Sequence, residues 1–172
     1  VKYHHPAKNL RVIGVTGTNG KTTTCFMIWH MLNSAGLKTG LMTTIAYGVD
    51  SLHPELNHMT TVDASTLNHR ISQIAKHGAE FLVLEVTSHA LAEFRTLGIP
   101  FEIAVFTNLT HDHLDYHKTF TNYRSAKGKL FKKAKYSILN ADDPASKYYQ
   151  NLSKEYITYG INSGQFRAKD IK

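Results

Sequence analysis

Positions 16–24 read Thr-Gly-Thr-Asn-Gly-Lys-Thr-Thr-Thr, a combination of glycine, lysine and hydroxyl groups that can bind phosphate. An apolar run precedes this stretch, and a helix-like pattern follows it. In a Gly-rich loop between strand and helix, backbone N–H groups point inward and the helix N-terminus adds positive charge. Lys21 can then reach the outer phosphates, while Thr22 can bind magnesium. We predict an ATP site formed by Gly17, Thr18, Asn19, Gly20, Lys21, Thr22 and Thr23.

The alternative is an ordinary strand–turn–helix unit that binds nothing. The generic phosphate-loop pattern, G-x-x-x-x-G-K-[ST], requires glycine at position 15, where this chain has valine. The strand-like and helix-like flanks nevertheless favour nucleotide binding.

Two later strand-like runs lead to possible metal ligands. Positions 81–86 are apolar except for Glu85, whose carboxylate would be costly to bury without a partner or a metal. The ligand crevice of an open α/β sheet lies where its strands end, so we expect Glu85 there. Three histidines and two aspartates lie between His111 and His117, after the run at 103–107. Zinc is one interpretation, but a magnesium site that uses one of these side chains agrees better with the ATP loop.

A helix-like segment at 121–133 carries one unexpected residue. Tyr123, Leu130 and Phe131 lie on its apolar side, and Lys127 falls on or beside that side. Either Lys127 points inward or, as is usual for lysine, it lies at the surface. The sequence pattern leaves both alternatives open.

The elements that must position these residues alternate along the chain. Strand-like runs span 11–15, 38–44, 81–86, 103–107, 136–140 and 156–159. One helix-like pattern follows the phosphate loop, a second follows Asp63, which can cap it, and a third begins at Thr121. The residues Asp142–Pro144 are typical of a further helix start. We expect a loop through Gly48 and Pro54. This alternation predicts an α/β fold with a largely parallel sheet flanked by helices, in a single domain over residues 1–172.

Composition narrows the class of protein. The 172 residues are 42% hydrophobic and 19% charged, which is typical of a soluble globular domain. No apolar run is long enough to span a membrane, and the single cysteine fits the cytoplasm. The net charge of +7 fits either an anionic small molecule or nucleic acid. Because no nucleic-acid-binding motif accompanies the basic residues, we predict neither a nucleic-acid nor a membrane partner.

Four blocks are similar to the motifs of the Mur ligase family, which makes amide bonds in peptidoglycan precursors. They are Gly-Thr-Asn-Gly-Lys-Thr at 17–22, Glu-Val-Thr-Ser-His-Ala-Leu at 85–91, Phe-Thr-Asn-Leu-Thr-His-Asp-His-Leu-Asp-Tyr-His at 106–117, and Ala-Lys-Gly-Lys-Leu-Phe at 126–131. Together they are far more specific than the loop alone. The resemblance implies that this chain is the family's central domain, whose fold is similar to that of P-loop NTPases. Thr-Thr-Val-Asp-Ala at 60–64 is similar to a motif of the MurE-type, tripeptide-forming branch, with Val62 in place of its proline.

The resemblance also implies roles for single residues. Lys21, His113 and Lys127 would be catalytic, and Asn108 would join the nucleotide-binding residues. Magnesium would be bound by Thr22, Glu85, His113 and Lys127, the last as a carbamate formed with carbon dioxide. The UDP-sugar peptide would be bound by Thr60, Thr61, Thr87, Glu93 and Arg95. At the position of Glu93 the family often has glutamine.

The reaction implied is ATP-dependent addition of the third amino acid to UDP-N-acetylmuramoyl-L-alanyl-D-glutamate. A substrate carboxylate attacks the γ-phosphate, and the amine of a free amino acid then attacks the acyl phosphate. ATP and two magnesium ions would take part. Because the family also has an N-terminal UDP-binding domain and a C-terminal domain, we expect this chain to be an incomplete, monomeric central domain that is inactive alone. The amino acid added is left open.

Three rival functions remain. A related ligase, of the folylpolyglutamate or cyanophycin synthetase kind, would share the phosphate loop but lack the blocks at 60–61 and 87–95. A non-catalytic nucleotide-binding module would keep the fold, although the intact Lys21, Glu85, His113 and Lys127 argue against it. A basic nucleic-acid-binding NTPase would show salt-sensitive binding to DNA.

Overall fold

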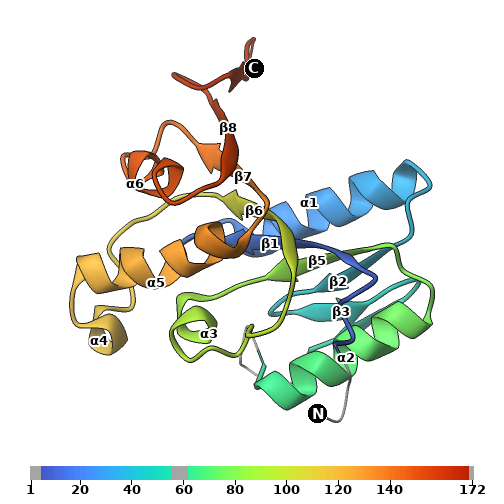
Figure 1. Ribbon diagram of the computed structural model, residues 1–172. Helices are drawn as coiled ribbons and strands as arrows, with labels where there is room; N and C mark the ends of the chain where they lie inside the picture. The colour runs from blue at the N-terminus through green and yellow to red at the C-terminus, as the bar shows by residue number, and fades with distance from the viewer. Residues whose placement is uncertain (1–4, 56–61, 171–172) are drawn as a thin grey trace.

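The computed structural model describes residues 5–55 and 62–170, which form a sheet covered by helices on both faces (Figure 1). The strands are β1 Arg11–Thr16, β2 Thr39–Met42, β3 Ala46–Gly48, β4 Leu52–Pro54, β5 Phe81–Glu85, β6 Phe101–Phe106, β7 Tyr136–Asn140, β8 Glu155–Gly160 and β9 Phe166–Arg167. The helices are α1 Lys21–Ser34, α2 Ala64–Lys76, α3 Ser88–Ala92, α4 Leu114–His117, α5 Phe120–Lys133 and α6 Ser146–Gln150.

The strand order is β4-β3-β2-β5-β1-β6-β7-β8-β9, with β1 in the interior of the sheet. Every pairing along β2-β5-β1-β6-β7-β8-β9 is parallel, which confirms the α/β prediction. Strands β1 and β5 are buried along nearly their whole length, since helices cover both of their faces. Their carboxyl ends therefore meet at one edge, where a ligand crevice is expected.

Two helical layers bury the sheet (Figure 1). Helix α1 packs on one face, where Cys25 lies against Val15 and Val83. Helices α2, α3, α5 and α6 cover the other face and share a larger core that includes Leu67 and Phe131. The described residues contain no helix long and apolar enough to cross a membrane.

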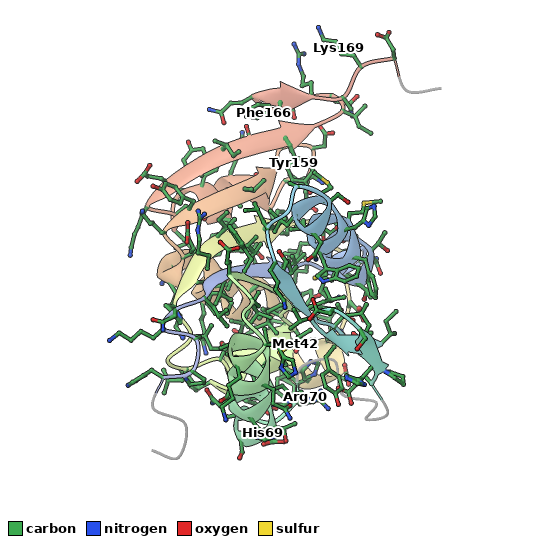
Figure 2. The ribbon with its side chains drawn as sticks, turned by 90° about the vertical axis from the view of Figure 1, so that its right-hand side faces the viewer. Met42, His69, Arg70, Tyr159, Phe166 and Lys169 are labelled. Carbon is green, nitrogen blue, oxygen red and sulfur yellow. The ribbon has the colours of Figure 1, made fainter. Side chains whose placement is uncertain are left out.

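One prediction about the chain path was wrong. The expected loop through Gly48 and Pro54 instead contains the short strands β3 and β4; β3 pairs antiparallel with β2, and β4 pairs antiparallel with β3. The sheet is therefore mixed at this edge. Each of these strands is three residues long, too short to show a clear alternation of apolar and polar residues. Figure 2 shows this half of the molecule, with Arg70 on α2, at the opposite end from Phe166 on β9.

A second correction concerns Asp142–Pro144, predicted as a helix start. Helix α6 begins only at Ser146. The Asp142 carboxylate instead accepts hydrogen bonds from the backbone N–H groups of Ile161, Asn162 and Ser163, and so fixes the turn after β8. An Asp–Pro sequence suits a turn as well as a helix N-terminus, and only the distant partners decide between them.

The cap predicted for α2 is confirmed. The Asp63 carboxylate accepts hydrogen bonds from the backbone N–H groups of Ser65 (2.9 Å) and Thr66 (3.1 Å). We expect Asp63→Ala to lower the free energy of unfolding by about 1 kcal/mol, since two N–H groups lose their acceptor. The melting temperature should fall by about 2–4 °C, as measured by calorimetry. Asp63→Asn, which still accepts these bonds, is the control and should lose less than half as much.

Candidate nucleotide and metal site

The predicted phosphate loop connects β1 to α1 across the carboxyl edge of the sheet. Gly20, at the N-cap of α1, has a φ of 78°, a left-handed conformation that suits glycine. No side chain within residues 5–55 and 62–170 caps this helix and no acidic residue lies in its first turn, so its N-terminal N–H groups suit an anion. A Cβ at Gly17 would lie 1.9 Å from Thr107 Oγ1, so the loop packs against the end of β6 as only glycine permits.

Asn108, predicted to bind nucleotide, supports the loop. Its side-chain oxygen accepts a hydrogen bond from Asn19 N–H, and its amide nitrogen donates to the Asn19 carbonyl; each donor–acceptor distance is 3.0 Å. Its own carbonyl accepts from Thr18 N–H at 2.8 Å. These bonds fix Thr18 and Asn19 from the neighbouring strand, while a direct contact of Asn108 with nucleotide stays a prediction.

The expected phosphate ligands lie together. Lys21 Nζ donates to the Thr18 carbonyl at 2.7 Å, so its ammonium lies over the loop. Thr22 follows on the first turn of α1 and faces β5, whereas Thr23 is exposed. A lysine above a ring of N–H groups can pair with a phosphate chain.

Glu85 occupies the position that the sequence suggested for a metal ligand. Parallel pairing places it beside Val15, one residue before the phosphate loop. Its side chain is buried, and its Oε2 accepts hydrogen bonds from Thr22 Oγ1 (2.9 Å) and Thr44 N–H (3.2 Å). A carboxylate and a hydroxyl at this spacing can share one magnesium ion, which in proteins usually completes its shell with phosphate oxygens and water.

Lys127 is buried, so the inward alternative is correct. Only 1% of the residue is exposed, and its Nζ donates a hydrogen bond to the carbonyl of Gly17 at 2.8 Å. The pKa of this amine is lowered to about 7, because burial disfavours the charged form and the nearby Lys21 ammonium repels it. Near neutral pH a substantial share of the amine is therefore unprotonated and nucleophilic.

Tyr123 connects Lys127 to the other predicted ligand, His113. Lys127 Nζ lies 4.6 Å from the centre of the Tyr123 ring, and the His113 ring lies 6.0 Å from the same centre. The Tyr123 hydroxyl is 3.1 Å from Thr18 Oγ1 in the phosphate loop. Sequence reasoning assigned Tyr123 only to an apolar helix face. Its place one helical turn before Lys127 was the available signal.

Two further histidines surround His113. The His89 ring lies 4.9 Å from that of His113 and 5.5 Å from that of His117. His117 is buried, with its Nε2 2.9 Å from Ser88 Oγ. Burial lowers the pKa of both His89 and His117, and neighbouring histidines lower it further. These rings therefore favour the neutral form, the one that accepts hydrogen bonds or binds metals.

The predicted substrate residues are placed less completely. Thr60 and Thr61 lie outside the described residues. Thr87 follows β5 at the ligand edge, where its Oγ1 accepts a hydrogen bond from Ala90 N–H and caps α3.

Glu93 and Arg95 bind each other just after α3. Arg95 Nε donates to Glu93 Oε2 at 2.8 Å, and the Tyr116 hydroxyl donates to Glu93 Oε1 at 3.1 Å. Arg95 therefore holds the pKa of the Glu93 carboxyl below its ordinary value. That these two side chains share a substrate site with the phosphate loop stays a prediction.

The zinc alternative receives no support. Among residues 5–55 and 62–170, no group of three or more His, Cys, Asp or Glu side chains is arranged to hold a metal. A structural zinc site requires four such ligands. The Thr22–Glu85 pair fits magnesium with a phosphate chain, because that ion needs few protein ligands.

The buried Lys127 amine predicts a pH dependence of stability. Its pKa is about 7 in the folded chain and 10.5 ordinarily, so between these values the unfolded chain binds more protons. The free energy of unfolding should therefore rise with pH through this window, by about 2 kcal/mol between pH 7 and pH 9. Urea unfolding in CO2-free buffer should show this rise, and Lys127→Met should lack it. Equal slopes in both proteins would mean that the amine is not desolvated.

Comparison with known proteins places this geometry in context. The family model described as Mur ligase middle domain matches residues 15–172. A UDP-N-acetylmuramoyl-L-alanyl-D-glutamate–2,6-diaminopimelate ligase of Geobacillus thermodenitrificans is 44% identical over 170 residues, which cover 92% of this chain and 34% of the relative. A UDP-N-acetylmuramyl-tripeptide synthetase of Deinococcus radiodurans is 39% identical over 172 residues, covering 98% and 35%.

Two solved structures share the fold of this chain. The structure of a UDP-N-acetylmuramoyl-L-alanyl-D-glutamate–2,6-diaminopimelate ligase superimposes with a TM-score of 0.82 at 36% identity, over 93% of this chain and 34% of the other. MurF from Acinetobacter baumannii shares the fold, with a TM-score of 0.71 at 18% identity over 96% and 34%. The chain spans about a third of the length of the relatives it matches.

Proposed function

The chain belongs to the Mur ligase family, and on that premise we propose that it supplies the ATP-binding part of a ligase that joins 2,6-diaminopimelate to UDP-N-acetylmuramoyl-L-alanyl-D-glutamate. The relatives that are 2,6-diaminopimelate ligases support the choice of amino acid, which the sequence of this chain left open. The observation that carries the proposal is the buried Lys127 amine, held 2.8 Å from the phosphate-loop carbonyl of Gly17. If α5 only stabilised the fold, Lys127 would not need to be buried with its amine directed at the phosphate loop.

The phosphate loop would hold ATP. The N-terminal N–H groups of α1 and the Lys21 ammonium would bind its phosphates, which brings positive charge to the place where negative charge must accumulate. Thr22 and Glu85 would hold one magnesium ion, and His113 with Lys127 a second. When bound, such ions cancel repulsion between an attacking carboxylate and the γ-phosphate.

Lys127 would serve as a carbamate. Its unprotonated, neutral amine attacks carbon dioxide, a nitrogen–carbon bond forms as one carbon–oxygen π bond opens, and one proton leaves to solvent, so a neutral amine becomes an anion. The pKa of about 7 makes the reactive amine available near neutral pH. Gly17 and Tyr123 would keep the group directed at the phosphate loop.

The ligation then follows in two steps. The substrate carboxylate attacks the γ-phosphorus, the bond to the bridging oxygen of ADP breaks, and an acyl phosphate results. The amine of the amino acid attacks the acyl carbon, phosphate leaves, and the ammonium proton passes to solvent. The chain's part is to hold the phosphates in line through Lys21 and the loop.

Arg95 and Thr87 would bind the UDP-sugar peptide, together with Thr60 and Thr61. Arg95 offers a guanidinium to an anionic substrate group, which would compete with the Glu93 carboxylate for it. The monomeric state and the lack of a nucleic-acid partner stay predictions.

Phosphate release tests the proposal. The gene product that carries this chain is incubated with ATP, magnesium, the UDP-muramoyl dipeptide and one of diaminopimelate, lysine or ornithine. We expect release that depends on the dipeptide and is fastest with diaminopimelate. Release with folate or a polyaspartate–arginine acceptor, and none with the dipeptide, would instead assign a related ligase.

A further inference from the structure

Lys129 on α5 reaches across to the end of α3, where the chain turns toward Arg95. Its Nζ donates a hydrogen bond to the Leu91 carbonyl at 3.2 Å and makes a longer contact of 3.5 Å with the Ala92 carbonyl. We propose that Lys129 is a positioning residue for the UDP-sugar peptide, because it holds the turn that carries Arg95. This inference rests on the function proposed above, in which Arg95 binds that substrate.

The two carbonyls need a partner from outside their helix. Helix α3 ends at Ala92, and the last carbonyls of a helix have no N–H partner within it. A lysine ammonium is a suitable donor there, since its charge also interacts favourably with the partial negative charge of a helix C-terminus. Lys129 thus fixes the end of α3 from a neighbouring helix.

The turn after α3 contains a backbone conformation that is unusual for its residue. Phe94 has a φ of 57°, in the left-handed region, which a bulky aromatic residue rarely adopts. Such a conformation persists where surrounding contacts determine it. Phe94 is 58% exposed, so burial in the core contributes little, but Lys129 Nζ lies 4.2 Å from the centre of its ring. At this distance the ammonium attracts the ring face and helps to hold the turn.

Arg95 directly follows this turn, so the φ of Phe94 decides where its side chain begins. The Arg95 N–H donates to the Ala90 carbonyl at 2.9 Å, which returns the backbone to α3. Its Nε donates to Glu93 Oε2 at 2.8 Å, within the same turn. A guanidinium that is fixed before binding loses less entropy when an anionic substrate group arrives.

Lys129 lies on a different side of α5 from Lys127. Two residues along a helix turn the side chain by about 200°. Lys127 Nζ donates to the phosphate-loop carbonyl of Gly17, whereas Lys129 Nζ donates to α3. Loss of the Lys129 ammonium should therefore affect binding of the UDP-sugar peptide and leave nucleotide binding intact.

Steady-state phosphate release provides the test. The gene product that carries this chain is assayed with the UDP-muramoyl dipeptide varied, at saturating ATP, magnesium and diaminopimelate. We expect Lys129→Met, which keeps the apolar stem, to raise the KM for the dipeptide by about three- to tenfold. The kcat and the KM for ATP should stay within about twofold, because only binding of the dipeptide is weakened.

Three further variants serve as comparisons. Lys129→Arg keeps a cation and several donors and can stack on Phe94, so the KM for the dipeptide should stay within about twofold. Lys129→Gln keeps N–H donors without the charge, and it should show the same selective rise to a smaller extent. Lys132→Met removes an exposed cation from the same helix and should change neither KM. Melting temperatures of all variants show that each is folded.

A double-mutant cycle shows whether Lys129 acts through Arg95. In an Arg95→Met background the guanidinium is already lost, so Lys129→Met should raise the KM for the dipeptide by less than about twofold further. A lysine that touched the substrate itself would keep its full effect in that background.

Three results would overturn the inference in a gene product that releases phosphate with the dipeptide. The first is an unchanged KM for the dipeptide in both Lys129→Met and Lys129→Gln. The second is an equal rise in the KM for ATP, which would indicate a general loss of structure. The third is a full effect of Lys129→Met in the Arg95→Met background. If the unaltered gene product releases no phosphate with the dipeptide, the proposed function itself is wrong, and this inference falls with it.

Discussion

Lys127→Ala is expected to reduce ligation by on the order of 10²–10³-fold while ATP still binds. The amine lies inside the protein, beside the phosphate loop and on the same Tyr123 ring as His113. If it becomes a carbamate, its loss removes an anionic metal ligand from the transition state but leaves Lys21 and the loop intact. Phosphate release by the gene product, and binding of a fluorescent ATP analogue, separate the two effects.

Rescue distinguishes the carbamate from a structural role. Added acetate or formate should restore part of the activity of Lys127→Ala, because a free carboxylate can occupy the space left by the side chain. Neither anion should help Lys127→Met, which fills that space. Lys132→Ala, an exposed lysine on the same helix, is the matched control and should retain full activity. Full activity of Lys127→Ala, without added carboxylate, would remove the carbamate from the mechanism.

Lys21→Ala is expected to abolish measurable ligation, with a loss of at least about 10²–10³-fold. The Lys21 ammonium lies over the loop, 2.7 Å from the Thr18 carbonyl, where it can pair with the outer phosphates. Without it, a carboxylate must approach a γ-phosphate whose charge is less well balanced. Unlike Lys127→Ala, this change should also weaken ATP binding, as measured by calorimetry on the 172-residue chain.

Two controls support this second experiment. Lys38→Ala removes a lysine that pairs with Asp50 (3.0 Å), outside the phosphate loop, and should leave ATP affinity unchanged. Lys21→Arg keeps the charge but alters its shape and reach, so it should recover only part of the binding. Unchanged turnover of Lys21→Ala would refute the assignment of the phosphate loop.

The histidine cluster shows where motif matching stops. The resemblance selected His113 from several histidines, and the structure places it beside Tyr123. It did not indicate that His117 would be buried with its ring nitrogen 2.9 Å from Ser88 Oγ, because that contact joins α3 to α4 across 29 positions of sequence. Such partners depend on how helices pack on the sheet.

The sequence by itself determined the local features of this protein. The order of the central strands and of the long helices α1, α2 and α5, the glycine positions of the phosphate loop, the Asp63 cap and the family all follow from neighbouring residues or from short motifs. These are local because turn geometry, capping and strand burial depend on residues a few positions apart.

Only the tertiary structure decided which distant groups meet. It turned Lys127 inward rather than outward, placed Glu85 against Thr22, and paired β3 with β4 where a loop was expected. The spacing of apolar residues predicts which side of a helix is buried, but not which residues of other elements that side contacts. Those groups are fixed by the strand order β5-β1-β6, which brings three carboxyl ends to one edge, together with the packing of α5 on that sheet.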